Sequence, residues 1–136
     1  MPFLSLRTMK KSLKKAERLY KRDSITLLFR HGKKGGVSPI RIIYRYVPQV
    51  EREDTICLKA AWSVPKRNFK KAVDRNAIKR KMKEAYRLHK TPLQEALIKE
   101  NKCLHLIFIY NSKEKVSYKK IEDKIILILQ RLQGIK

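Results

Sequence analysis

The sequence predicts an α+β protein in which helices pack on a mixed, mainly antiparallel sheet. Helix-type and strand-type patterns occur in the order helix, strand, strand, helix, strand, helix, within the 136 residues typical of one domain. An apolar share of 43% is enough for a real core, although 35% of the residues are charged. A helical stretch also separates two of the strands, so we expect a β-α-β crossover if those strands are parallel.

The first helix is expected from Arg22 to His31, with the sequence RDSITLLFRH. Either Asp23 or Ser24 is suited to cap its start, and Gly32 is suited to end it. The basic, glycine-rich stretch 33–39 that follows is interpreted as a connection. It does not have the pattern of a phosphate-binding loop, because no strand leads into it and no Lys-Ser/Thr pair opens a following helix.

Two strands are expected next, at residues 40–47 and 55–64. The first alternates, and one of its faces carries Ile40, Ile42, Tyr44 and Tyr46. An open platform is one interpretation of this tyrosine face, because aromatic side chains near arginines suit unstacked bases. Packing of the same aromatics in the core is the competing interpretation. In the second strand, the single tryptophan, Trp62, is interpreted as structural.

The second half of the chain predicts three helices and one strand. A basic helix is expected at 74–88, and a second, short helical stretch opens at Pro92. Residues 104–110, LHLIFIY, are nearly all apolar, which is typical of a central strand covered on both faces. Ser117 is suited to cap a last helix. The expected buried stripe of that helix is Ile121, Ile125, Ile128, Leu129 and Leu132.

The stretch from Pro65 to Arg87 is the most unusual part of the chain. It holds ten lysines and arginines against two acids, Asp74 and Glu84. Helical spacing predicts an apolar stripe of Ile78, Met82, Ala85 and Tyr86. On the opposite side it places Asn76, Arg80, Lys83 and Arg87, with Arg75 and Lys79 on a flank. We expect Arg80 or Arg87 to be the partner of Glu84.

The formal charge of +23 predicts a polyanionic partner. A merely solvated helix face usually mixes charges of both signs, and this one hardly does. Nucleic acid is favoured over a membrane surface, because the apolar stripe of the basic helix is better explained as core. No apolar run approaches the ~18 residues of a transmembrane helix.

The residues AVDRNAIKR at 72–80, followed by EAYR at 84–87, resemble the arginine-rich helix of the bacterial ribonuclease P protein subunit. Four residues match that motif position for position: Arg75, Asn76, Lys79 and Arg80. Ala77 departs from it, because the family usually has a second arginine there, and Lys70 stands where many members carry glycine. The first helix is also similar, since it ends in an aromatic residue, a basic residue and glycine.

This resemblance implies a fold and a function. The fold is a ribosomal-protein-like two-layer sandwich whose β-α-β crossover is left-handed. The function is that of the protein component of ribonuclease P, an RNA-dependent endoribonuclease. In that family the RNA subunit removes the 5′ leader of precursor tRNA using Mg²⁺, so no catalytic residue and no metal are expected on the protein. The implied partners are the RNA subunit and precursor tRNA, in the cytoplasm, with no membrane and no obligate protein partner.

Two groups of site residues follow from the cations and from the resemblance. The residues expected to bind RNA are Lys66, Arg67, Lys70, Lys71, Arg75, Asn76, Lys79, Arg80, Lys83 and Arg87. The resemblance places the tRNA leader on Ile25, Phe29, Ile42, Tyr44 and Tyr46. A plain core aromatic is the alternative interpretation of Phe29.

The remaining expectations concern domain limits and absent chemistry. Residues 1–20 are expected to be a flexible basic N-terminal arm, and residues 21–136 a single RNA-binding domain. The two cysteines, Cys57 and Cys103, are expected to be free thiols in a reducing compartment. The three histidines show no ligand spacing with either cysteine, so no zinc site is argued. A ribosomal protein and a DNA-binding regulator are the alternative functions.

Overall fold

The computed structural model describes residues 17–52 and 56–134, and it confirms the predicted α+β class. Its elements are α2 (Arg22–His31), β1 (Lys33–Val37), β2 (Ile40–Tyr46), the 3-10 helix η2 (Gln49–Glu51), β3 (Leu58–Ser63), α3 (Ala72–His89), α4 (Thr91–Glu100), β4 (Leu104–Tyr110) and α5 (Tyr118–Gly134). The order of elements is therefore the predicted one, with an additional strand after α2.

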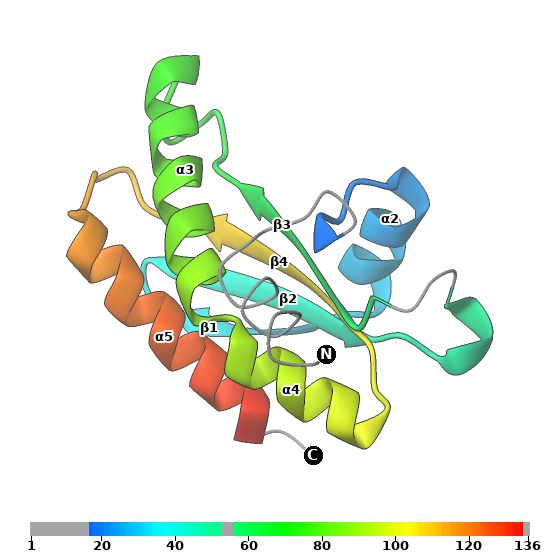
Figure 1. Ribbon diagram of the computed structural model, residues 1–136. Coiled ribbons are helices and arrows are strands. Elements are labelled where there is room, and N and C mark those ends of the chain that lie inside the picture. The colour runs from blue at the N-terminus through cyan, green and yellow to red at the C-terminus, as the bar shows by residue number, and fades with distance from the viewer. Residues whose placement is uncertain (1–16, 53–55, 135–136) are drawn as a thin grey trace.

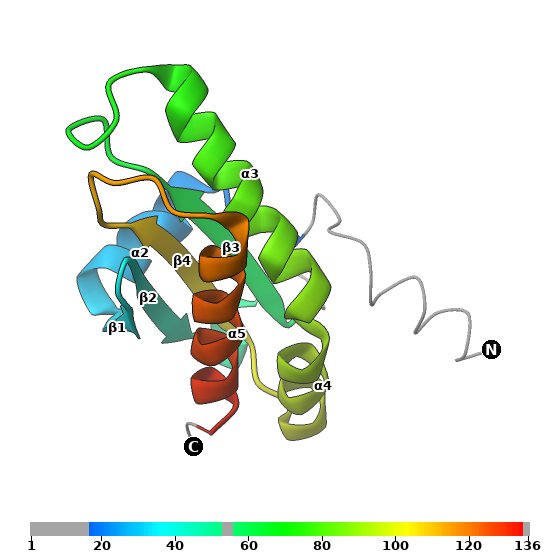
Figure 2. The same cartoon turned by 90° about the vertical axis from the view of Figure 1, so that its left-hand side faces the viewer.

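The four strands form one mixed sheet in the order β1-β2-β4-β3. The strand β2 pairs antiparallel with both β1 and β4, whereas β3 runs parallel to β4. The parallel pair is joined by α3 and α4, which is the predicted crossover. Figures 1 and 2 show that this connection passes over the face of the sheet that α5 also covers, and that the crossover is left-handed. General stereochemistry favours the opposite hand, so the resemblance alone predicted it correctly.

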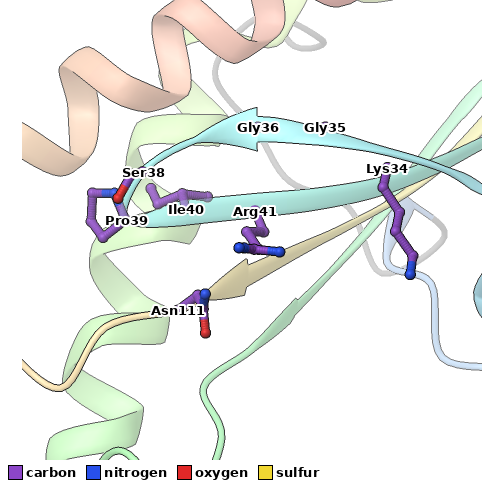
Figure 3. Close-up of a pocket in the computed structure, with 8 residues that line it drawn as sticks. All are labelled: Lys34, Gly35, Gly36, Ser38, Pro39, Ile40, Arg41 and Asn111. Atoms are coloured by element: carbon purple, nitrogen blue, oxygen red, sulfur yellow. The ribbon is translucent and has the colours of Figure 1, made fainter.

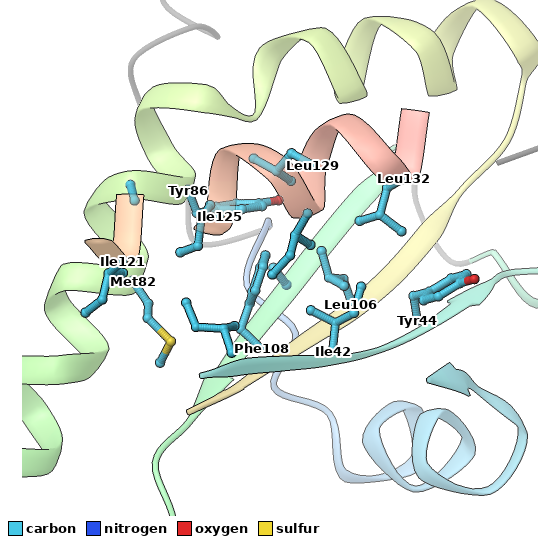
Figure 4. Packing of buried hydrophobic residues seen from close by; sticks show 14 of the residues in the cluster. Ile42, Tyr44, Met82, Tyr86, Leu106, Phe108, Ile121, Ile125, Leu129 and Leu132 are labelled. Carbon is cyan, nitrogen blue, oxygen red and sulfur yellow. The ribbon is translucent and has the colours of Figure 1, made fainter. Parts of the chain in front are cut away.

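Helices lie on both faces of the sheet. The helices α3, α4 and α5 cover one face and α2 lies on the other (Figures 1 and 2). Figure 4 shows the main core on the face of the sheet covered by α3, α4 and α5, where Phe108 and Leu106 of β4 pack against Ile125 and Leu129 of α5. The second core, under α2, is smaller: Leu19, Leu28, Ile43 and Ile107.

The two long helices bury the stripes that helical spacing predicted. The stripe of α3 is Ile78, Met82, Ala85 and Tyr86, and that of α5 is Ile121, Ile125, Ile128, Leu129 and Leu132. The Ser117 hydroxyl accepts a hydrogen bond from the backbone N–H of Lys120 at 3.3 Å, as expected of a cap. α3 begins at Ala72, two residues before its predicted start.

The glycine-rich stretch after α2 is a strand, so its interpretation as a connection is wrong. Lys33–Val37 pairs with β2 as the outer strand of the sheet. Strand pairing uses only the backbone, so this edge forms although Val37 is the single β-branched residue of the strand. Gly36 has φ +122°, and a Cβ there would lie 2.5 Å from the carbonyl oxygen of Ile40. The hairpin therefore requires glycine at this position.

The start of α2 differs from the predicted capping, whereas the helix ends at Gly32 as predicted. The helix begins at Arg22 after Lys21, and no side chain caps it, so neither Asp23 nor Ser24 has the predicted role. At its other end the backbone of Gly32 is extended, with φ −73°. A Cβ on Gly32 would collide with the Leu28 carbonyl oxygen and with the side chain of Ile43. Glycine therefore lets the end of α2 lie directly against β2.

The segment predicted as a flexible arm ends earlier than residue 20. Glu17 and Leu19 are buried, and the N–H of Leu19 donates a hydrogen bond to the carbonyl oxygen of Ala60 at 2.8 Å. The boundary therefore lies at or before Glu17. Residues 1–16 of that prediction lie outside the described residues.

Candidate nucleic-acid interface

The outward side of α3 and the loop before it form a basic surface. All ten residues expected to bind RNA lie in these two segments and retain solvent exposure. The more exposed members are Lys66, Arg67, Lys70, Lys71, Asn76 and Arg80. The others, Arg75, Lys79, Lys83 and Arg87, are half-buried. Because the apolar stripe is buried and this side is not, the sequence placed both faces of α3 correctly.

Arg75 holds the loop that precedes α3. Its Nη1 atom donates to the carbonyl oxygens of Phe69 and Lys70, each at 2.8 Å. Phe69 is buried in the main core, so the loop is fixed both by packing and by these two hydrogen bonds. Charge-assisted hydrogen bonds of this kind are stronger than neutral ones. The guanidinium group therefore organises the cations at 66–71 in addition to carrying a charge of its own.

The two acids of this region are both paired with cations. The Nζ atom of Lys115 lies 2.8 Å from Oδ1 of Asp74, and this hydrogen bond lowers the pKa of the Asp74 carboxyl. Nη2 of Arg87 lies 2.7 Å from Oε2 of Glu84, which confirms one of its two predicted partners. That hydrogen bond lowers the pKa of Glu84 and raises the pKa of Arg87. Neither carboxylate interrupts the positive potential along the outer side of the helix.

The face of the sheet under α2 presents apolar and aromatic groups beside cations. The side chain of Phe29 is 51% exposed, so the interpretation of it as a core aromatic is wrong. Ile25 is half-buried on the same helix and packs on the small core that contains Leu28, Ile43 and Ile107. An exposed aromatic ring beside apolar side chains is a suitable platform for an unstacked nucleobase.

Ile42 and Tyr44 lie on the opposite face, against the prediction. They are 4% and 8% exposed, and Figure 4 shows both on the side of the sheet that carries Leu132 of α5. Tyr46 is half-buried, burial raises the pKa of its hydroxyl, and the Nζ atom of Lys102 lies 5.4 Å from its ring centre. The open-platform interpretation of this tyrosine face is therefore wrong. The core interpretation is correct for Ile42 and Tyr44.

The alternate residues of β2 point toward the α2 side. There a hollow of about 340 Å³ is lined by Lys34, Gly35, Arg41, Ile42, Ile43, Arg67, Ile109 and Asn111. An adjoining hollow of about 370 Å³ shares Lys34, Arg41 and Asn111, and Figure 3 shows these three side chains pointing away from α5. Arg41 and Ile43 were not predicted as site residues. The alternation of β2 places them on one face, and the position of α2 leaves Arg41 exposed while Ile43 is buried in the small core.

The interface contains no candidate metal centre among the residues that the structure describes. No three His, Cys, Asp or Glu side chains lie close enough together in this part of the chain to hold a metal ion. Cys57 and Cys103 are free thiols within it. None of the described helices has the length and apolar character needed to cross a bilayer. The described chemistry is that of a binding surface made of cations and apolar groups.

Comparison with known proteins connects this surface to one family. A family model described as Ribonuclease P matches residues 13–133. A ribonuclease P protein component from Porphyromonas gingivalis is 35% identical over 122 residues, which cover 90% of this chain and 87% of the relative. One from Chlorobaculum tepidum is 36% identical over 98 residues, which cover 68% and 62%.

Solved structures agree with the fold. The RNase P protein from Thermotoga maritima aligns with a TM-score of 0.62 at 22% identity, over 88% of this chain and 98% of that one. A Staphylococcus aureus RNase P protein mutant aligns with a TM-score of 0.64 at 19% identity, over 96% and 95%. At this level of identity the two structures support the fold.

Proposed function

The chain belongs to the ribonuclease P protein family, the protein part of an endoribonuclease, and we propose from this that its two surfaces have two separate RNA ligands. The basic surface of α3 and its preceding loop binds the RNA subunit of the enzyme. The face under α2 binds the single-stranded 5′ leader of precursor tRNA. The observation that carries the proposal is the conjunction of family membership with these two surfaces, which are built on different elements and adjoin where Arg67 lines the hollow with Lys34 and Arg41.

Binding of the RNA subunit is supported by the geometry of α3. The outer row of this helix contains Asn76, Arg80, Lys83 and Arg87, with Lys79 on its flank, and its two acids are paired with Lys115 and Arg87. Like charges at helical spacing repel one another by a few tenths of a kcal/mol per pair. A phosphate backbone relieves this repulsion and releases counterions, so cations of this kind supply affinity with little dependence on sequence.

Binding of the leader is supported by the different character of the α2 side. Phe29 offers an exposed ring on which a nucleobase can stack, and Ile25 of the same helix packs on the small core that contains Ile43. Lys34 and Arg41 line the adjoining hollow, where they are suited to phosphates of an extended strand. Stacking with flanking cations is the usual way in which proteins hold single strands of varied sequence. This assignment keeps Ile25 and Phe29 of the predicted leader site and replaces Ile42 and Tyr44, which are buried, by Lys34 and Arg41, which are exposed and line the hollow.

The protein contributes binding and orientation to the reaction. The RNA subunit, with its Mg²⁺, is expected to supply the groups that act on the scissile phosphate. Holding the leader beside that centre lowers the entropic cost of aligning the substrate, which is a recognised source of catalysis. The protein therefore acts by selecting precursor over mature tRNA and by stabilising the folded RNA.

The test of this proposal is the salt dependence of binding to ribonuclease P RNA from the same organism. If the α3 surface neutralises ~6–10 phosphates, the affinity should fall by about 10³–10⁵ between 50 and 200 mM salt. The triple replacement of Arg75, Lys79 and Arg80 by alanine should weaken binding and flatten the salt response, with the circular dichroism spectrum unchanged. A nearly flat response in the wild-type protein would refute the proposal.

A further inference from the structure

The segment before α2 crosses the exposed edge of β3 and is fixed on both sides of the sheet. On the face covered by α3 and α4, Glu17 is buried and its Oε1 atom accepts hydrogen bonds from Nζ of Lys90 at 2.6 Å and from Nε2 of Gln94 at 2.7 Å. On the other side, Leu19 is buried in the small core under α2. Arg18 lies between these two anchors, pairs with Ala60 of β3 as a β-bridge, and keeps its side chain exposed.

Arg18 and Lys83 lie over the same part of β3, because Arg18 bridges to Ala60 and the Nζ atom of Lys83 lies over the ring of Trp62, two residues further along the strand. The pKa of Lys83 is lowered, first by partial burial and then by the positive charges of Arg18 and Lys79. Within residues 17–52 and 56–134, no carboxylate pairs with any of these three cations. Three like charges gathered without a counter-charge raise the energy of the protein alone, and an anion placed among them lowers it.

Trp62 supports this group from below. Its indole ring stacks on Phe108 with ring centres 6.3 Å apart and meets the edge of Tyr86 at 5.4 Å. The Nζ atom of Lys83 lies 5.7 Å from the centre of the Trp62 ring, within the range of a cation–π interaction. Because the indole is held on two sides by core aromatics, it gives the ammonium group a defined position. A preorganised cation loses less conformational entropy on binding than a free lysine does.

We propose that Arg18, Lys79 and Lys83 form a phosphate-binding site at the edge of β3, with Trp62 as the positioning residue beneath Lys83. The ligand is a backbone phosphate of RNA, because the site continues the cation row of α3. Arg18 suits this ligand through its fork of N–H donors, and the two lysines through their point charges. The inference rests on the proposed function, since it extends the surface of α3 to a residue outside the arginine-rich helix.

The site joins two parts of the chain that are more than 60 positions apart in sequence. Its ligand therefore binds only when residues 17–19 are docked on β3, and binding stabilises that docking by mass action. Trp62 is the single tryptophan of the chain, so its fluorescence reports on the site directly. A phosphate beside Lys83 changes the charge above the indole ring, and the emission should change with the same concentration dependence as RNA binding.

The experiment compares four single variants, and the double variant Arg18→Gln with Lys83→Gln, in binding to ribonuclease P RNA at several salt concentrations. Arg18→Gln and Lys83→Gln should each lower the slope of log affinity against log salt by about one. Together they should lower it by less than the sum, because both cations contact one phosphate. Arg131→Gln, an exposed cation on α5, is the matched control and should leave the slope unchanged. Arg80→Gln tests the outer row of α3 independently.

The outcomes separate this inference from the proposed function. If Arg18→Gln behaves like Arg131→Gln while Arg80→Gln weakens binding, the site at the β3 edge is refuted and the proposed function stands. If Arg80→Gln also has no effect, the proposed function itself fails. The RNA-induced change in Trp62 emission should be lost in Lys83→Gln, and its persistence there would also contradict the site. Thermal unfolding of each variant checks that Lys83→Gln leaves the fold intact.

Discussion

The side chains of Phe29 and Tyr44 lie on opposite faces of the sheet. Tyr44 is 8% exposed in the main core beneath α5, whereas Phe29 is 51% exposed on α2. The two aromatics therefore cannot contact the same nucleotide. Any effect of Tyr44 on RNA binding must come through the stability of the fold, and any effect of Phe29 through direct contact.

Replacing Tyr44 by alanine should lower the free energy of unfolding by about 3–5 kcal/mol, the range found for a buried aromatic residue. The measurement is urea denaturation, with Phe29→Ala as the exposed control, for which we expect a change within about 0.5 kcal/mol. Where Tyr44→Ala is still folded, it should bind precursor and mature tRNA in the wild-type ratio. A small loss of stability with a selective loss of precursor binding would return Tyr44 to the leader site.

Arg75 should not be replaceable by lysine. Lysine keeps the charge and has enough N–H donors, but its ammonium group has a shorter reach and lacks the fixed planar geometry that holds Nη1 between the carbonyl oxygens of Phe69 and Lys70. We expect Arg75→Lys to lose affinity for the RNA subunit by about tenfold, equivalent to ~1.4 kcal/mol. Arg80→Lys is the matched control and should lose much less. Equal losses in the two variants would mean that Arg75 contributes only its charge.

Ala77→Arg restores the residue that the family usually has at this position. Ala77 is half-buried at the edge of the outer side of α3, where a long side chain has room to reach solvent. We therefore predict an affinity for the RNA subunit that is unchanged or mildly higher, measured by a filter-binding titration. A tenfold loss of affinity would indicate that α3 of this protein docks on RNA in a different orientation.

Tyr86 should make stability sensitive to alkaline pH. The phenol is fully buried, and burial raises its pKa well above the usual 10, with a further contribution from Glu17. The unfolded chain loses this proton near pH 10 while the folded chain retains it. The stability due to Tyr86 is therefore complete below pH 10 and decreases above it by about 1.4 kcal/mol per pH unit.

Tyr86→Phe provides the comparison for this pH effect. The hydroxyl of Tyr86 has no hydrogen-bond partner within the described part of the chain, so its removal should cost little at pH 7. Above pH 10 the variant should become more stable than the wild-type protein, as measured by denaturant unfolding across the pH range. Parallel curves for the two proteins would show that Tyr86 ionises as easily in the folded state as in the unfolded one.

Sequence patterns were reliable where one face of an element is buried and the other is not. The stripes of α3 and α5 follow this rule, and their residues were predicted without error. For β2 the same approach failed, because helices cover both faces of the sheet. Ile42 and Ile43 are both buried, one on each face, so alternation identified two faces but not which of them lies beside α2.

Other features have no local signal in the sequence. The strand β1 is held by backbone pairing with β2, and its glycines are residues that strands usually avoid. Glu17 and Lys90 form a buried pair across 73 positions, and nothing near either residue indicates the other. The left-handed crossover opposes the general preference, so it was expected only from the family resemblance.

The central claim is that the α2 face holds the leader while α3 holds the RNA subunit, and one variant tests it most directly. Phe29→Ala, assembled with the RNA subunit, should bind precursor tRNA more weakly by about 1–3 kcal/mol, the value of one base stacked on an aromatic ring. Mature tRNA, which lacks the leader, should bind as to the wild-type enzyme, and so should the RNA subunit to the protein. An equal loss of affinity for precursor and mature tRNA would contradict the account.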